Sequence, residues 1–485
     1  MIDGSKPVNA EEYQKCIMIG GISMSINYGS KILIRTSGRR TFRRCIRKWG
    51  FQSGLKMNLD RIGSESNIHF WFGSAIHWAM EDYFGYNKFG DPRRAFKAYY
   101  DCFDEIDKPM LADTHYDLGI GMLTYFLEWL PRHNQTMQFK TLWLTHDENG
   151  YHESAQGVDG AYPAVEQSFE LDLGVRVVRD PITKKIYYRY KEGEDFPSKV
   201  FSLEYPGGDI NYYIVEEDGR KVDVEICPIV YHGTFDRLVI DRFGRWWILD
   251  YKTAKGADTN KLDTDDQISA YMWAAEQWFQ HKIHGFVYLQ LTKEVPKPPR
   301  RLKNGNLSVD KKQKTTYGLY RDAVINDYGD VSKAPSSIIE ALNAFAEQET
   351  PEGDKFIRWD FVTRTDAQKV STYHNIMAEV MMQTDPNLIL FPNPTRDCIW
   401  DCPFRDVCIA MDDDRMYEAQ AILDANYAER SDTDESNHEE WKDRLVYPTG
   451  PVECAETPDE FVSSVDNIFN IILPPEYMVG DEYER

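Results

Sequence analysis

GTFDRLVIDRFGRWWILDYKTAKG, residues 233–256, decides the fold of this 485-residue chain. Its two apolar runs, LVI and WWIL, flank the turn DRFGR, and this pattern predicts a β-hairpin. A turn centred near Phe243 places Asp236 opposite Asp250, where paired residues have Cβ atoms about 4.5–5.5 Å apart. Lys252, two residues beyond Asp250, points to the same face of its strand. The stretch therefore predicts two carboxylates and an ammonium gathered at one end of a hairpin.

Two opposed carboxylates repel each other unless something positive lies between them. A divalent cation such as Mg²⁺ or Mn²⁺, which prefers oxygen ligands, is the natural candidate. With Lys252 beside it, the arrangement suits the activation of a water and the stabilisation of charge on a phosphodiester under attack. The alternative is a surface cluster in which Lys252 and Arg237 pair with the two aspartates, with little energetic consequence.

The hairpin residues resemble a family signature. Asp236, followed by Asp250-Tyr251-Lys252 at the end of an apolar strand, is similar to the D…(D/E)-x-K signature of the PD-(D/E)XK nuclease superfamily. A helix predicted over residues 264–280 carries Gln267 and Tyr271, which are four apart and share a face. This pair resembles the Q-x-x-x-Y motif that follows the catalytic hairpin in the RecB-like branch. The alternative is that the pair merely belongs to the polar face of a helix.

A helix predicted over residues 68–86 adds a third motif. It contains GSAIH, residues 73–77, which resembles the G-x-x-x-H helix of the RecB-like branch, whose histidine helps to bind metal. Taken alone, His77 is more often a partly buried helical histidine than a ligand. Glu166, near the start of VEQSFELDL, is a loose match to the first core strand. The order histidine, aspartate, Asp-x-Lys, Gln-x-x-x-Tyr is the family's order, and four accidents in that order are improbable.

The resemblance implies an α/β fold of mixed α and β elements, a restriction-endonuclease-like core with a central mixed β-sheet flanked by helices. It implies that Asp236 and Asp250 hold one or two Mg²⁺ or Mn²⁺ ions, with His77 and the backbone carbonyl of Tyr251 as further ligands. Lys252 would orient or activate the attacking water. The two motif residues of the following helix would position the scissile phosphate or the lysine. The implied catalytic residues are Asp236, Asp250, Lys252, Gln267 and Tyr271.

A cysteine cluster lies in DCIWDCPFRDVC, where Cys398, Cys402 and Cys408 are spaced C-x₃-C-x₅-C. Three thiolates this close favour zinc or an iron–sulfur cluster, and Cys45 in the run FRRCIRKWGF is the best candidate for a fourth ligand. AddB-type and CRISPR-associated relatives join one cysteine before the histidine helix to three near the C-terminus. That resemblance implies a [4Fe–4S] cluster stapling a helical C-terminal part to the N-terminal segment. The relatives have two residues between the first two clustered cysteines and this chain has three, so Zn²⁺ or free thiols remain alternatives.

The net charge of −23 is unevenly distributed. Residues 411–485 hold 21 acidic and 5 basic residues, which leaves a net charge of only −7 for the rest. Residues 31–61 and 293–314 are locally basic and could bind phosphates. In the first stretch, the interleaved Trp49 and Phe51 could stack on bases. Solvated loops are the alternative reading, above all for the second stretch.

The chain is expected to divide into six parts. These are a basic N-terminal segment with the first cluster cysteine (1–65), a helical part with the histidine helix (66–135), a β-rich insertion with the first core strand (136–232), the catalytic hairpin, helix and strand (233–295), a basic loop with helices and the cysteine cluster (296–410), and an acidic tail (411–485). Further helices are predicted over residues 336–346 and 365–382. Within the tail, SDTDESNHEE has the composition of a disordered segment.

These patterns together predict a metal-dependent DNA nuclease, an exonuclease acting on DNA ends or single strands in recombination, repair or phage DNA metabolism. DNA is the expected partner, and a helicase, a recombinase or a single-strand-binding protein are candidate protein partners. No secretory signal and no run of the roughly 18 apolar residues that a span needs is present. We therefore expect no membrane partner and a cytoplasmic location in a bacterial or phage-infected cell. The alternative is a catalytically silent DNA-binding or scaffold subunit of a DNA-processing complex.

Overall fold

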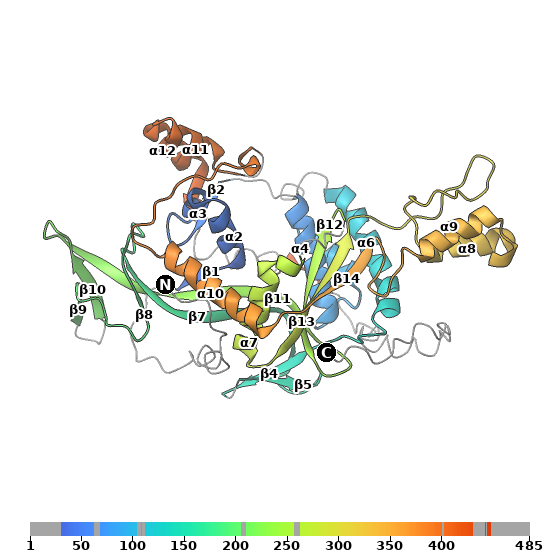
Figure 1. Cartoon of the computed structure of the whole chain (residues 1–485), viewed down its shortest axis with the longest axis horizontal. Helices are drawn as coiled ribbons and strands as arrows, with labels where there is room; N and C mark the ends of the chain where they lie inside the picture. Colours follow the sequence, from blue (N-terminus) through green and yellow to red (C-terminus); the bar gives the residue numbers. More distant parts are fainter. Residues whose placement is uncertain are drawn as a thin grey trace.

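A computed structural model describes residues 31–62, 68–103, 108, 112–148, 150–204, 210–256, 262–399, 402–429, 442 and 444–447 (Figure 1). Its strands are β1 (Ile32–Ile34), β2 (Leu59–Arg61), β3 (Lys140–Thr141), β4 (Trp143–Asp147), β5 (Gly150–Ser154), β6 (Tyr162–Pro163), β7 (Val165–Arg179), β8 (Ile186–Lys191), β9 (Val200–Glu204), β10 (Ile210–Val215), β11 (Lys221–Ile240), β12 (Trp246–Ala254), β13 (Ile283–Thr292), β14 (Ile357–Val362) and β15 (Tyr427–Glu429). Its α-helices are α2 (Thr36–Arg44), α3 (Ile46–Gln52), α4 (Ile68–Phe84), α5 (Pro92–Asp101), α6 (Ala112–His133), α7 (Asp266–Phe279), α8 (Tyr317–Tyr328), α9 (Ser336–Ala346), α10 (Asp366–Gln383), α11 (Arg405–Asp412) and α12 (Met416–Asn426). Three short 3₁₀ turns are η1 (Leu262–Thr264), η2 (Val331–Lys333) and η3 (Arg396–Cys398).

A mixed β-sheet forms the centre of the molecule. Its strands follow the order β14-β13-β12-β11-β10-β9, and β1, β3 and β7 also pair with β11. β12 and β13 run parallel, β1 runs parallel to β11, and the other pairs of this sheet are antiparallel. The predicted hairpin is β11–β12, whose turn is closed by Asp241, which accepts hydrogen bonds from the backbone N–H groups of Phe243 and Arg245. Gly244 supplies the positive φ, +76°, that this turn requires.

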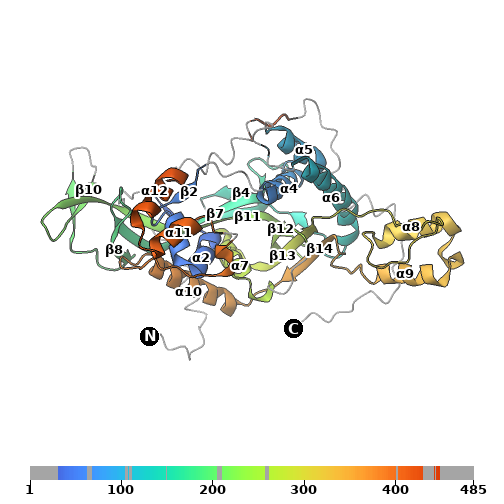
Figure 2. The same ribbon diagram turned by 90° about the horizontal axis from the view of Figure 1, so that it is seen from above.

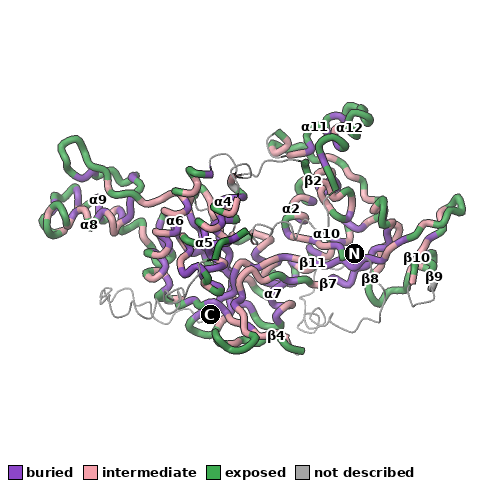
Figure 3. The backbone as a smooth tube through the Cα atoms, turned by 180° about the vertical axis from the view of Figure 1, so that it is seen from behind, coloured by how far each residue is buried: buried purple, intermediate pink, exposed green. Residues whose placement is uncertain are grey.

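Helices cover both faces of this sheet. α7 and α10 pack on one face and α4, α5 and α6 on the other, and the buried chain concentrates between them (Figures 2 and 3). The alternation along β12 explains its apolar sequence, because Trp246 and Ile248 enter the α7 side while Trp247 and Leu249 enter the α4 side. The predicted α/β fold with a helix-flanked mixed sheet is confirmed. None of the described helices is both long and apolar enough to cross a membrane.

The sheet extends into an arm on one side. β7 and β11 are long and paired over most of their length, with a bulge between Ile229 and Val230. Their far ends join β8, β9 and β10 around a small separate core, which lies at the left of Figure 1. This arm accounts for the β-rich composition before residue 233.

A second module is inserted between two neighbouring strands. β13 and β14 pair directly, yet residues 293–356 separate them and form α8 and α9 around their own core. The module projects at the right of Figures 1 and 2. α9 coincides with the helix predicted over residues 336–346, whereas α8 and β14 were not predicted.

The C-terminal helices pack against the N-terminal segment. α11 and α12 share a core with Phe51 of α3, and β15 pairs with β2. The acidic tail is expected to begin at residue 411. Its first part, residues 411–429, instead contains α12 and β15, which pack against the N-terminal segment. The segment predicted to be disordered, residues 431–440, lies outside the described residues, as do Cys16 and Cys454.

Candidate active site

Three carboxylates line up across three neighbouring strands. The β11–β12 register pairs Arg237 with Leu249, and the β11–β7 register pairs Phe235 with Gln167. One further step in each register sets Asp236 beside Asp250 on β12 and beside Glu166 on β7. We call Glu166, Asp236 and Asp250 the carboxylate row. The predicted opposition of the two aspartates follows from this register, because the turn is centred where the sequence places it.

The row lies where β11 and β12 separate. The last paired residues are Arg237 and Leu249, and β12 continues alone on that side. Tyr251 would lose its hydrogen bonds to β11 there, but two side chains replace them. Its N–H donates to Asp236 Oδ2 at 2.8 Å, and its carbonyl oxygen lies 3.0 Å from His77 Nε2. Side chains of a helix and a strand thus cap the split, and the Tyr251 carbonyl faces the site.

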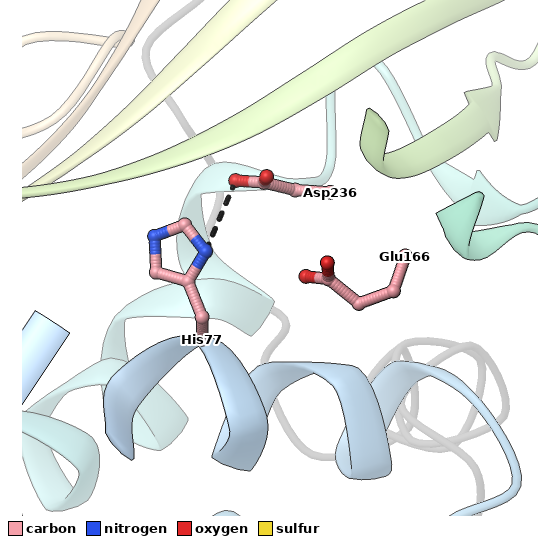
Figure 4. A group of neighbouring side chains, drawn as sticks. All are labelled: His77, Glu166 and Asp236. Carbon is pink, nitrogen blue, oxygen red and sulfur yellow. Dashed lines mark ion pairs between the residues drawn. The ribbon is translucent and has the colours of Figure 1, made fainter. Parts of the chain in front are cut away.

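His77, Glu166 and Asp236 converge on one point. A ring nitrogen of His77 and one carboxylate oxygen from each acid all lie within 4.8 Å of one another (Figure 4). His77 Nδ1 is 3.4 Å from Asp236 Oδ2. Since Nε2 faces a carbonyl, which only accepts, the proton of a neutral His77 sits on Nε2 and its Nδ1 lone pair faces the carboxylate. A cation between Nδ1 and the carboxylate would relieve that repulsion.

Glu166 is the site residue that sequence reasoning placed only loosely. It begins β7 with a left-handed backbone, φ +44°, which turns its side chain toward His77 (Figure 4). A long-range strand register and one unusual dihedral bring it into the row, and neither is visible in the sequence. The only signal was its place near the start of an alternating strand.

Electrostatics in the row indicate missing positive charge. Burial, and then the charges of Asp236 and Glu81, raise the pKa of Glu166 well above its usual range. Burial and the charge of Asp236 likewise raise the pKa of Asp250 to about 6. Asp250 is buried, and Lys252 Nζ lies 2.7 Å from its Oδ2 as an ion pair. The ammonium of Lys252 therefore neutralises only part of the negative charge of the carboxylate row.

Lys252, Gln267 and Tyr271 gather on the α7 side of the same strands. Burial lowers the pKa of Lys252, but Asp250 and Asp236 outweigh it and hold the pKa above its usual value, so the group is an ammonium. Burial raises the pKa of Tyr271, and the row's aspartates contribute further. The Gln267 side chain hydrogen-bonds the Tyr271 phenol and lowers that pKa in part. All the residues that sequence motifs single out around the hairpin thus lie at one site.

The donors present fit a hard divalent cation. Carboxylate oxygens dominate the set, with one imidazole and the carbonyl of Tyr251 nearby, and Mg²⁺ and Mn²⁺ favour such ligands. The raised pKa values of the Glu166 and Asp250 carboxyl groups are the feature that a bound cation would remove. The residues able to hold the ion are His77, Glu166, Asp236, Asp250 and, through its carbonyl, Tyr251.

The four cysteines lie near the contact between α3 and α11. Cys45 lies between α2 and α3, and its charge raises the pKa of both Cys402 and Cys408, after burial as the main cause. Cys398 likewise raises the pKa of Cys402. All four thiols are free, and N–H donors point at three of them. Sγ of Cys45 accepts from Lys48 N at 3.4 Å, Sγ of Cys398 from Thr395 N at 3.4 Å, and Sγ of Cys408 from Arg47 Nη1 at 3.2 Å.

The first basic stretch is less available to DNA than its composition indicates. Trp49 and Phe51 are buried, so the predicted base stacking is wrong. Four of its arginines pair with acidic residues of the protein. These are Arg39 and Arg43 with Glu379 and Asp266, Arg44 with Asp397, and Arg47 with Asp412.

Comparison with known proteins bears on this site. A family model described as the PD-(D/E)XK nuclease superfamily matches residues 36–409, well over half of the chain. The matched range begins at α2 and ends within α11, so it includes the carboxylate row, α7 and all four cysteines. No curated protein matches the chain.

Proposed function

The chain belongs to the PD-(D/E)XK nuclease superfamily, and on that premise we propose that it is a divalent-metal-dependent deoxyribonuclease of the RecB-like branch. Its reaction is hydrolysis of DNA phosphodiester bonds. Its expected mode is exonucleolytic, on DNA ends or single strands, in recombination, repair or phage DNA metabolism. A helicase, a recombinase or a single-strand-binding protein are the candidate protein partners.

The carboxylate row carries this proposal. Its acids lie side by side one step beyond the last β11 pairings, with Asp250 buried and Glu166 and Asp236 half-buried, against their mutual repulsion. A protein that used this fold only as a scaffold would gain stability by replacing one acid with a neutral residue. Retention of the row beside Lys252 therefore supports a working metal site over a silent scaffold subunit.

A bound Mg²⁺ or Mn²⁺ would supply Lewis-acid stabilisation of the phosphate and a lowered pKa for the attacking water. His77, Glu166, Asp236, Asp250 and the Tyr251 carbonyl are the proposed ligands. The residues on the α7 side of the strands would act on the water and the phosphate. Lys252 orients or activates the water and offers positive charge to the phosphate oxygens. Gln267 and Tyr271, linked to each other, position the scissile phosphate and the lysine.

We assign the four cysteines to a [4Fe–4S] cluster. Tetrahedral zinc with Zn–S bonds of about 2.3 Å needs sulfurs about 3.8 Å apart. Among the described residues, no three cysteine sulfurs lie within 4.8 Å of one another, so the structure does not contain the close set of sulfurs that zinc needs. The three N–H groups donating to sulfur are also of the kind that tune iron–sulfur clusters. The cluster would close the packed ends of the chain.

Cleavage of end-labelled single- and double-stranded DNA by anaerobically purified full-length protein tests the proposal, with Mg²⁺ or Mn²⁺ added. The wild type should cleave, and Asp250→Ala and Lys252→Ala should each lose at least about a hundredfold. Asp322→Ala, an exposed acid on α8, is the matched control. The product ladder would report polarity. An intact, metal-loaded protein that binds DNA without cleaving it would support the scaffold alternative instead.

A further inference from the structure

One arginine of the first basic stretch stands apart from its neighbours. The residues from 39 to 47 include five arginines, and four of them form ion pairs within the protein. Arg40 is exposed, and it makes no hydrogen bond or ion pair in the part of the chain that the structure describes. Among the described residues, Arg40 is therefore the one arginine of this run without an acidic partner, and its charge is available to a ligand.

Helix α2, which carries Arg40, is held against the N-terminus of α7 by ion pairs. Arg39 is fully buried, and its Nη1 lies 3.1 Å from Asp266 Oδ2, at the first residue of α7. Arg43 Nη2 reaches the same oxygen at 2.9 Å. Both arginines also pair with Glu379 of α10, at 2.7 and 2.6 Å. α2 therefore crosses the N-terminus of α7, one residue before Gln267.

Arg40 lies close enough to the site for its charge to act on Tyr288 of β13. It follows Arg39 by about 100° around the helix, so it leaves the buried face. Burial and the charge of Asp250 raise the pKa of Tyr288, and the charge of Arg40 lowers it in part. Tyr288 pairs with Asp250 in the β12–β13 register, and Lys252 Nζ lies 5.5 Å from its ring centroid. Arg40 and Lys252 thus both approach Tyr288, beside the carboxylate row.

We propose that Arg40 binds a backbone phosphate of the substrate next to the scissile bond. This inference rests on the proposed function, and it names the substrate contact that α2 provides. A guanidinium can hold two phosphate oxygens at once, and it stays charged at any relevant pH. The ion pairs of Arg39 and Arg43 are positioning contacts, because they fix the helix that aims Arg40. The packed cysteine region at the other end of α2 holds the same helix in place.

The test is the salt dependence of DNA binding. A labelled single-stranded oligonucleotide is titrated with full-length protein in a chelator, so that cleavage does not interfere. Arg40→Gln should reduce the slope of log K against log salt by about 0.7, the amount of one phosphate contact to a single strand. It should also weaken binding by about tenfold at moderate salt. Arg40→Lys should keep most of the slope, and Arg321→Gln, a control on the surface of α8, should match the wild type.

The possible outcomes distinguish failure of the Arg40 proposal from failure of the proposed nuclease function. Cleavage by the wild type together with an unchanged slope in Arg40→Gln would overturn the Arg40 assignment and leave the nuclease standing. Failure of the wild type to cleave, with the slope still reduced in Arg40→Gln, would support the phosphate contact and remove the nuclease. Equal loss of binding in Arg40→Lys and Arg40→Gln, with lowered melting temperatures, would mean a structural role and would overturn the proposal.

Discussion

The backbone N–H of Tyr251 donates to the carboxylate of Asp236 at 2.8 Å, across the point where β11 and β12 part. Asp236 therefore has two tasks. It satisfies a buried donor that strand pairing leaves free, and it presents its charge to the carboxylate row. Substitutions can separate these tasks, since the first needs only an acceptor oxygen and the second needs a charge.

Asp236→Asn and Asp236→Ala should differ in stability but not in activity. Both remove the charge, so each should lose at least about a hundredfold in metal-dependent cleavage. The amide oxygen of asparagine can still accept from Tyr251, whereas alanine leaves that N–H unsatisfied at a cost of about 1–3 kcal/mol. Thermal unfolding in a chelator measures the difference. Asp223→Ala, an exposed acid on the same strand, is the control, and equal melting temperatures for the two Asp236 variants would contradict the capping role.

The metal-free protein should lose stability as pH rises past the usual range of an aspartate. The pKa of Asp250 is raised from 3.8 to about 6 in the folded state. Between these values the folded chain keeps a proton that the unfolded chain has released, so the free energy of unfolding falls with rising pH. Asp250→Asn removes this contribution, and its stability relative to the wild type should grow from about pH 4 to about pH 6. Denaturant unfolding in a chelator at several pH values checks this, and a constant difference would contradict it.

Local patterns predicted the hairpin, its register and the face on which Asp250 and Lys252 lie. The turn DRFGR leaves little freedom in where the strands reverse, and alternation along β12 then decides which side chains share a face. α9 also coincides with its predicted range. Such features depend on residues within about one hairpin or helix of each other, which is the range that periodicity can read.

Long-range pairing explains what the sequence did not predict. Glu166 joins the row through a strand pairing with residues about 70 positions away and through a positive φ. β14 is a short strand recruited beside β13 across an inserted module, and its six residues carry no turn signal of their own. The arginines of α2 and α3 read as a basic patch, because their partners Asp266, Glu379 and Asp412 are hundreds of residues distant.

The buried ion pair of Lys369 and Glu276 should stabilise the packing of α10 against α7. Lys369 Nζ contacts both carboxylate oxygens of Glu276, at 2.6 and 2.7 Å, and its side chain is 1% exposed. Lys369→Met leaves a buried carboxylate without its ammonium, which should cost about 3–5 kcal/mol. Adding Glu276→Gln should restore much of that loss, since the amide oxygen can still accept from Ile283 N. Denaturant unfolding measures both variants.

The matched control for that pair is Lys282→Met. Lys282 pairs with Asp366 at 4.0 Å, and both side chains are largely exposed. Its loss should change stability by no more than about 0.5 kcal/mol. A similar effect of both lysine substitutions would mean that the buried pair contributes no more than a surface ion pair.

Cys45→Ser should release the C-terminal helices if the cysteines bind one cluster. Cys45 is the only proposed ligand outside residues 398–408, so its loss removes the link that the cluster would make between α2–α3 and α11. Anaerobically purified variant should have less bound iron, a weaker visible absorption band and faster proteolysis after β14. Cys102→Ser is the control, because its hydroxyl can still donate to Tyr99 O as the thiol does. Stoichiometric zinc in place of iron would replace the cluster assignment, whereas normal iron content in Cys45→Ser would exclude Cys45 as a ligand.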